Sequence, residues 1–258
     1  MRISKIYPGI AAISLLSLAS ALQIWAQENG GEVESFNRSL GLEGMGTDLA
    51  SVEHELEHGT PANTPETSNT QNPKKGSVQK RAPIQPTESF SNLAFHANPA
   101  VTNTVRSFYV SRMNAAALVN APNYDALIDR FDERFANYGY SRHNVGDTVA
   151  GYMIVTWEIL HNADASNTPM GIRRVRTAVC QVLEKRGKAA RLTSENKQKI
   201  SELLKCLAEL GIQQVRQGRQ TNNQASILQA ENLLTQFPRS LGIDLRQYRL
   251  TDQGFING

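Results

Sequence analysis

The chain is poor in cysteine: its 258 residues include only two, Cys180 and Cys206. Two cysteines cannot supply the disulfide scaffold of many small exported domains, so a folded domain must rest on its own hydrophobic core. After the N-terminal segment the chain also lacks any apolar run of about twenty residues, the length that a membrane-spanning helix needs. The sequence therefore predicts that the chain is not integral to a membrane once that segment has been removed.

Catalytic signatures are scarce as well. The sequence contains no G-x-S-x-G nucleophile elbow and no glycine-rich phosphate loop. These absences argue against an α/β-hydrolase and against a nucleotide-binding enzyme. Nothing in the composition indicates a cofactor, and we expect none.

Residues 1–26 have the three parts of a secretory signal peptide. Arg2 and Lys5 supply the positive start, residues 10–22 form an apolar run, and Ala26 is a small residue suited to cleavage. The apolar run is short for a bilayer, which favours a cleaved signal over the alternative, an anchor that stays in the membrane. We therefore expect an exported protein, periplasmic or extracellular.

Residues 27–90 predict an acidic arm and a disordered linker. Residues 27–60 hold eight acidic residues against Arg38 as their single base. Residues 59–90 repeat proline among threonine, serine, asparagine and glutamine, a composition that buries too little apolar surface to offset chain entropy. Residues 91–258 hold 20 lysines and arginines against 14 aspartates and glutamates, so the acidic arm is expected to lie loosely on a basic domain.

The basic balance of the domain bears on its partners. Because export is expected, nucleic acid is excluded as the partner of this positive charge. Clustered positive charge attracts anionic surfaces, so we expect an anionic envelope polymer, a lipid surface or a protein. No pattern in the sequence indicates an oligomeric state.

Helical periodicity dominates the domain, and no strand-like alternation of useful length interrupts it. Six helical patterns result: one from Asn98-Pro99, then 124–138, 144–161 and 168–187, one from Thr193, and one that ends at Pro238. The third pattern is apolar nearly all round, which is typical of a central buried helix. The sequence predicts an all-α fold, a single bundle of about five or six helices.

Two groups of short strings stand out, one in the third predicted helix and one near the C-terminus. They are Asn144-Val145-Gly146-Asp147 with Tyr152 and Thr156-Trp157-Glu158, and Gly242-Ile243-Asp244-Leu245 with Leu250-Thr251-Asp252-Gln253-Gly254-Phe255. Over about residues 98–255 the chain resembles an uncharacterised family of exported bacterial proteins with a helical domain of unknown function, in which alanine usually replaces Gly146. The resemblance implies a helical domain attached to a signal peptide, and no activity, cofactor or catalytic residue.

The sharpest motif is His54-Glu55-Leu56-Glu57-His58, which matches H-E-x-x-H. On a helix this spacing lets two histidines share a zinc ion while the glutamate activates a bound water. Here the motif lies in the acidic arm, Gly59-Thr60-Pro61 ends any helix directly after it, and the glycine and histidine of the extended zinc motif do not follow. We interpret His54, Glu55 and His58 as a chance match and predict no metal site.

Polar residues interrupt the apolar surface of the third predicted helix. Asp147, Glu158 and His161 share one stripe, and Arg112 lies on an apolar face of the first predicted helix. Buried carboxylates need partners, so we favour a structural ion pair that involves Arg112. The alternative is a functional pocket, because active sites and structural networks perturb charges alike. A di-iron site is rejected, since only Glu158-x-x-His161 has the required spacing in the helical domain.

Residues 173–199 form the densest basic stretch, with nine lysines and arginines against Glu184 and Glu195. Four of them surround the turn between the fourth and fifth predicted helices: Lys185, Arg186, Lys188 and Arg191. Two interpretations stay open, a solvated helix face and an anion-binding patch.

The two cysteines lie on the fourth and fifth predicted helices. If these helices form an antiparallel hairpin, Cys206 is offset from Cys180 by about 9 Å at 1.5 Å per residue. A disulfide needs Cα atoms within ~7 Å. We predict two unpaired, partly buried thiols, with a disulfide as the alternative if the helices are staggered.

The function is not specified by any one motif, and two hypotheses follow. The favoured one is an exported, non-enzymatic helical module that interacts with an envelope component or a protein partner. The alternative is an envelope hydrolase with a polar site on the third predicted helix, around Asp147, Glu158 and His161. A concave site with convergent polar groups would discriminate between the two, because enzymes need one.

Overall fold

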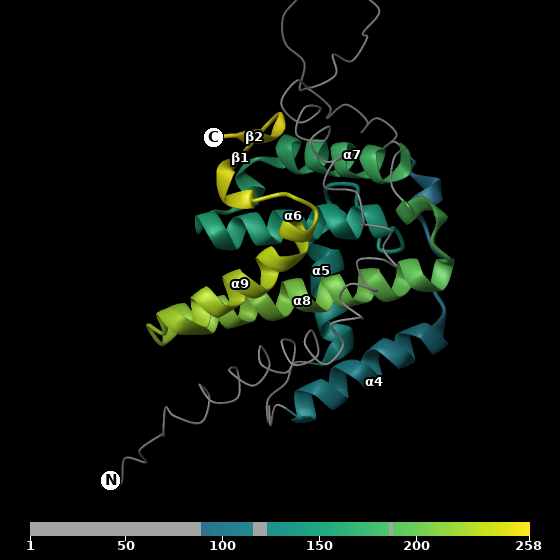
Figure 1. Ribbon diagram of the computed structural model, residues 1–258, viewed down its shortest axis with the longest axis horizontal. Coiled ribbons are helices and arrows are strands. Elements are labelled where there is room, and N and C mark those ends of the chain that lie inside the picture. The colour runs from purple at the N-terminus through teal and green to yellow at the C-terminus, as the bar shows by residue number, and fades with distance from the viewer. Residues whose placement is uncertain (1–88, 116–122, 186–187) are drawn as a thin grey trace, which may run out of the picture.

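The computed structural model describes residues 89–115, 123–185 and 188–258. In these ranges the chain forms six α-helices and a C-terminal antiparallel hairpin (Figure 1). The helices are α4 (Pro99–Ala115), α5 (Tyr124–Ala136), α6 (Val145–His161), α7 (Pro169–Lys185), α8 (Ser194–Gln220) and α9 (Gln224–Ser240). Short 3-10 helices are η1 (Ser91–Leu93), η2 (Ala165–Asn167), η3 (Lys188–Arg191) and η4 (Leu245–Gln247). The predicted all-α bundle is confirmed, and none of these described helices has the length and hydropathy to cross a membrane.

The helices begin where the sequence supplies capping side chains. Asn144 Oδ1 accepts hydrogen bonds from the backbone N–H groups of Gly146 and Asp147, at 2.9 and 3.1 Å, and thereby caps α6. Thr193 caps α8 in the same way. Beyond the end of α5, Gly139 has a φ of 84°, a left-handed conformation that glycine adopts without steric cost. These local signals explain why the predicted starts of α6 and α8 are confirmed.

The sequence analysis predicts that the last helix ends at Pro238, but α9 continues to Ser240. A proline inside a helix leaves the carbonyl four residues before it without its usual N–H donor. Here that carbonyl belongs to Leu234, and the hydroxyl of Tyr152 on α6 donates to it at 3.1 Å. A tertiary contact thus satisfies the group that the proline leaves free.

Helix α6 is the central helix of the bundle (Figure 1). It packs against α7 on one side and against α8 on the other, and α9 also contacts it. Every residue from Val145 to Trp157 is buried. The prediction of a central buried helix, drawn from the all-round apolar pattern, is confirmed.

Helices α7 and α8 are consecutive, but α6 lies between them, so they do not form the antiparallel hairpin that was predicted (Figure 1). Cys180 and Cys206 are both unpaired, as predicted, because they belong to two different apolar clusters. Both thiols are fully rather than partly buried. Burial raises the pKa of each thiol well above its ordinary value, which suppresses the reactive thiolate.

A second, smaller apolar cluster joins α4 and α5 to α8, and its members are Val101, Val105, Tyr109, Tyr124, Leu127 and Cys206. Before α4, the segment 90–97 packs beside the start of α6. Phe90 and Leu93 are buried there, and Ala94 pairs with Asn144 in an isolated β-bridge. The packed part of the domain therefore includes Phe90, upstream of the predicted helix start at Asn98.

The C-terminal residues form a hairpin that the sequence analysis missed. Strand β1 (Tyr248–Thr251) pairs antiparallel with β2 (Gly254–Asn257). Each strand has four residues, too few for an alternating pattern to be recognised, so the prediction that strands are absent is wrong here. The indole N–H of Trp157 on α6 donates to the Tyr248 carbonyl at 2.9 Å, and the Phe255 ring lies 6.3 Å from the Trp157 ring. The two groups of strings that carry the family resemblance therefore pack against each other.

Candidate functional site

Asp147, a residue of the predicted polar site, forms a buried ion pair with Arg176 on α7. Asp147 Oδ1 lies 2.7 Å from Arg176 Nε, and Asp147 Oδ2 lies 3.2 Å from Arg176 Nη2. The backbone N–H of Ser141 donates to Oδ2 at 2.7 Å, and the Cys180 thiol lies 3.4 Å from Oδ1. The carboxylate has the ionic partner that burial demands, and this partner comes from the basic stretch.

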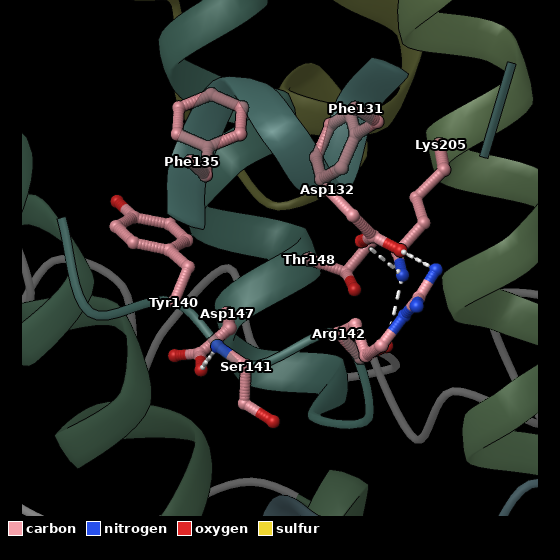
Figure 2. A pocket seen from close by; sticks show the side chains of 9 residues that line it. All are labelled: Phe131, Asp132, Phe135, Tyr140, Ser141, Arg142, Asp147, Thr148 and Lys205. Carbon is pink, nitrogen blue, oxygen red and sulfur yellow. Dashed lines mark hydrogen bonds and ion pairs between the residues drawn. The ribbon is translucent and has the colours of Figure 1, made fainter. Parts of the chain in front are cut away.

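Aromatic rings cover this ion pair. The guanidinium carbon of Arg176 lies 5.4 Å from the ring centroid of Phe90 and 5.9 Å from that of Tyr140. The cavity beside Asp147 has a volume of about 10 Å³, room for no more than one water molecule (Figure 2). An organic substrate does not fit in that volume, so the geometry around Asp147 is that of a structural ion pair.

Glu158 and His161 lie at the other end of α6. Glu158 is eleven residues from Asp147, which is about 16 Å along the axis at 1.5 Å per residue. Arg134 Nη1 donates to Glu158 at 3.2 Å, and His161 Nε2 lies 3.0 Å from the Leu245 carbonyl. Burial raises the pKa of Glu158. The structure therefore does not bring Asp147 together with Glu158 and His161.

The basic stretch is only partly a surface feature. Lys185 and Arg191 are exposed at the ends of α7 and η3. Lys197 is buried, and its ammonium group donates to the carbonyl groups of Asn92 and Ala190, so it ties the segment before α4 to η3. The structure does not describe the side chains of Arg112 and Lys188. Arg186 and the motif residues His54, Glu55 and His58 lie outside the described residues.

A larger cavity opens between α4, α5 and α8, and none of the predicted site residues lines it. Its volume is about 240 Å³, and residues before α4 and in the loop 141–143 complete its wall. We call it the cleft. Its charged lining residues are Asp125, Asp129, Asp132, Arg142, Glu202 and Lys205, beside the apolar residues Phe95, Ala97 and Ile128.

Glu202 on α8 is the most deeply buried carboxylate of the cleft, with 8 % of the residue exposed. Its Oε1 accepts hydrogen bonds from the Thr102 hydroxyl at 2.8 Å and the Gln198 amide at 2.9 Å. Its Oε2 accepts one from the Tyr124 hydroxyl at 2.6 Å. No lysine or arginine in the described ranges forms an ion pair with it, although a buried carboxylate is costly without a cation.

Lys205, one turn further along α8, pairs with Asp132 instead of Glu202. Lys205 Nζ lies 2.6 Å from Asp132 Oδ1 and donates to the Arg142 carbonyl at 2.8 Å (Figure 2). Burial lowers the pKa of Lys205, an effect that Asp132 opposes. Asp132 Oδ2 is buried and lies 3.3 Å from Arg142 Nη2, yet it accepts no hydrogen bond from the described residues. The wall of the cleft thus retains a buried acceptor without a donor.

Two further titratable groups line the cleft. Burial, reinforced by the hydrogen bond to Glu202, raises the pKa of Tyr124. The His143 ring packs edge-on against Phe95 with 5.6 Å between the ring centroids. Burial and then the charge of Lys205 lower the pKa of His143. At neutral pH the tyrosine is therefore protonated and the histidine is uncharged.

The cleft was not predicted, although the sequence of α8 contains a signal for it. Gln198, Glu202, Lys205 and Glu209 follow one another at i, i+4, i+7 and i+11, so they share one helical face, and all four are buried. Polar side chains on a buried face need polar partners, which marks this face as unusual. In the described part of the chain, no group of three or more histidine, cysteine, aspartate and glutamate residues is placed to hold a metal ion.

Comparison with known proteins yields a family and no activity. No curated protein and no solved structure shows a significant match to this chain. A family match covers residues 54–256, which extends further toward the N-terminus than the resemblance over 98–255 and begins at His54. The resemblance to an uncharacterised family is thereby confirmed. The chain belongs to the family of unknown function designated DUF6683.

Proposed function

We propose that the domain is a non-enzymatic binding module, and that the cleft between α4, α5 and α8 holds its ligand. The observation that carries this proposal is Glu202, a carboxylate buried at the cleft among neutral hydrogen-bond donors. A buried carboxylate without a cation is costly, and one that lines a cavity is a candidate for recognition or chemistry. The cavity beside it has polar groups that converge and apolar walls, as ligand sites do.

The chemistry of the lining residues favours binding over catalysis. Three neutral donors hold the carboxylate of Glu202 and leave one of its roughly four acceptor positions, which suits one more hydrogen bond from a ligand. The pKa of Tyr124 is raised, so its phenol stays protonated and is not a nucleophile at neutral pH. The hydrolase hypothesis rested on Asp147, Glu158 and His161, and neither of the cavities described above brings these three side chains together.

The same proposal places the module in the cell envelope, periplasmic or extracellular. The support is the N-terminal sequence, with its positive start and short apolar run before Ala26. Mass spectrometry of exported protein should find a mature chain that begins at Gln27, and a chain that begins at Met1 would contradict export. A second contact, to an anionic envelope polymer, a lipid surface or a protein, is proposed for the exposed bases Lys185 and Arg191 with their neighbours Arg186 and Lys188.

The cleft can be tested by filling it. Ala97 lines the cleft and is exposed, so Ala97→Trp should occupy the cavity without disturbing the core. Ala100→Trp is the matched control, because Ala100 is exposed on α4 and does not line the cleft. A set of small amines, carboxylates and sugars is screened against the purified protein by ligand-observed NMR.

The expected result of this screen is at least one compound that binds wild type and Ala100→Trp but not Ala97→Trp. Absence of binding by every compound, or binding that Ala97→Trp leaves unchanged, would contradict a ligand site in the cleft.

A further inference from the structure

The cleft has an excess of negative charge among its lining residues. Four carboxylates line it, from Asp125, Asp129, Asp132 and Glu202, against the two cations of Arg142 and Lys205. Asp125 and Asp129 are exposed, whereas Asp132 and Glu202 are deeper. Narrow, partly desolvated sites lined by one sign of charge concentrate ions of the opposite sign. Arg106, outside the lining, pairs with Asp125 at 2.6 Å, and the remaining lining residues still hold three carboxylates against two cations, which favours a cation.

The two cations of the cleft are already engaged. Lys205 Nζ pairs with Asp132 Oδ1 and donates to the Arg142 carbonyl. The Arg142 guanidinium lies 2.9 Å from Asp129 Oδ1 and 3.3 Å from Asp132 Oδ2. An anionic ligand would have to break these pairs before it met a free positive charge. An anion is thus a poor fit to this site.

Acceptors, by contrast, remain available. Asp132 Oδ2 is buried and lies 3.3 Å from Arg142 Nη2, but the geometry is not that of a hydrogen bond, so this oxygen lacks a hydrogen-bond donor among the described residues. Glu202 has only neutral donors, so a cationic donor would supply the ionic partner that it lacks. A buried acceptor without a donor costs free energy that a donor on a ligand recovers. The ligand should therefore present N–H groups that carry positive charge.

The apolar part of the lining constrains the rest of the ligand. Ile128 and the ring of Phe95 line the same cavity as the carboxylates. A cavity of about 240 Å³ is smaller than the ~300–1,000 Å³ of sites for drug-sized ligands. The occupant is accordingly a short aliphatic chain and not a large ring system.

Resting on the proposed function, we propose that the cleft recognises a protonated primary amine on a short aliphatic stem, with Glu202 and Asp132 as the groups that bind the ammonium. The amine can come from a free diamine or from a lysine side chain of a polypeptide, since both present the same group on the same stem. The ammonium would meet the two deep carboxylates, and the stem would lie against Ile128 and Phe95.

The test is isothermal titration calorimetry on the purified protein with four probes of similar size: 1,5-diaminopentane, 1-aminopentane, 1-pentanol and glutarate. Both amines should bind, and 1-pentanol should bind on the order of tenfold more weakly or not at all, because it lacks the charge. Glutarate should show no binding. Ala97→Trp should abolish the heat of amine binding, which places the amine in the cleft.

Substitutions identify the charged groups. Glu202→Gln should weaken amine binding by on the order of tenfold or more, since a buried hydrogen bond to a charged group is lost. Asp129→Asn, at an exposed position that pairs with Arg142, should weaken it roughly twofold to fivefold. Glu133→Gln is the matched control, because Glu133 is exposed on the same helix and does not line the cleft. It should leave the affinity unchanged, and circular dichroism should show that all three variants are folded.

A fifth probe distinguishes a free diamine from a lysine side chain as the source of the amine. It is lysine capped at both ends, as its N-acetyl methylamide. Binding at least as tight as that of 1,5-diaminopentane supports a lysine side chain as the natural ligand, and weaker binding supports a free amine. If 1-pentanol or glutarate binds as well as the amines and Ala97→Trp removes that binding, the proposal of a cation site is wrong while the proposed binding function stands. If no probe or screened compound binds, the proposed function itself fails.

Discussion

Two buried carboxylates, Asp147 on α6 and Glu202 on α8, are held in opposite ways. Asp147 has a two-point ion pair with Arg176, aromatic cover from Phe90 and Tyr140, and a cavity of about 10 Å³ beside it. Glu202 has three neutral donors and a cavity of about 240 Å³. Burial of a carboxylate is common to both, so it does not by itself mark a functional site. Glu202 is distinguished from Asp147 by the lack of an ionic partner among the described residues and by the larger cavity beside it.

The loop between α5 and α6 separates the two regions and contributes to both. Ser141 donates its backbone N–H to Asp147, and the next residue, Arg142, lines the cleft and accepts a hydrogen bond from Lys205 (Figure 2). The closed ion pair thus positions the loop that forms one wall of the open site. Substitutions in the Asp147–Arg176 ion pair should therefore alter ligand binding in the cleft as well as stability. Substitutions in the cleft should have little effect on the ion pair.

The largest expected loss of stability follows from breaking the buried ion pair of Asp147 and Arg176. Arg176→Met leaves Asp147 buried without its cation, and removal of one partner of a buried pair costs about 3–5 kcal/mol in the free energy of unfolding. Urea denaturation followed by circular dichroism measures it. The double variant Asp147→Asn with Arg176→Met should recover part of this loss, because no charge is left buried. A loss below about 1 kcal/mol in the single variant would show that the pair is not the structural element described here.

In the cleft, substitutions should affect ligand binding more strongly than they affect the free energy of unfolding. Glu202→Gln removes a charge that has no ionic partner, so the free energy of unfolding should fall by only about 1–2 kcal/mol, the scale of hydrogen bonds to a charged acceptor. The same urea titration measures this change beside that of Arg176→Met. An equal or larger loss for Glu202→Gln would make Glu202 as structural as Asp147 and would remove the contrast between the two regions.

A third buried carboxylate, Glu209 on α8, has a more distant ionic partner than Asp147, whereas Glu202 has none among the described residues. Glu209 is buried 3.7 Å from Arg134, which also binds Glu158, and burial raises its pKa although Arg134 opposes the shift. A carboxyl whose pKa is raised by folding stabilises the fold below its ordinary pKa, and this contribution is lost as the pH rises through the folded value. The wild type should therefore gain stability from Glu209 between pH 7 and about pH 4.5.

Glu209→Gln should remove that gain. The melting temperature of wild type and variant is compared at pH 7 and pH 5, with Glu133→Gln as the exposed control. The rise on acidification should be smaller in Glu209→Gln by a few degrees at most. An identical pH dependence in all three proteins would show that Glu209 is ionised equally in the folded and unfolded chain.

The smallest effect on stability is expected at the exposed end of α7. Replacement of Lys185, Arg186, Lys188 and Arg191 by glutamine should change the free energy of unfolding by no more than about 0.5 kcal/mol, as surface substitutions do. Retention on anionic vesicles should nevertheless be lost. Wild-type retention should fall steeply between low and physiological salt, because exposed charges are screened beyond ~8 Å. Equal retention of both proteins at every salt concentration would leave only a solvated face there.

How far the sequence could predict this molecule depends on the range of the interactions involved. Capping by Asn144 and Thr193, and the apolar pattern of 145–157, act within one helix, so the helices and the central place of α6 were predictable. The neighbours of α6 were not, because consecutive helices need not pack together. The ion pair of Asp147 with Arg176 was therefore not foreseen, and Arg176 counted only as part of the basic stretch, with a solvated face and an anion-binding patch both open.

The sequence by itself determined an all-α domain, its helix starts and two cysteines that cannot support a disulfide scaffold. Only the tertiary structure decided which charges meet. Glu202, Tyr124 and Thr102 come from three helices, and their hydrogen bonds join residues 78 and 100 positions apart in the chain. No local pattern encodes such contacts, since they depend on how helices are placed on one another. The cleft exists because α4 and α5 pack beside the polar face of α8, and that packing is a property of the whole fold.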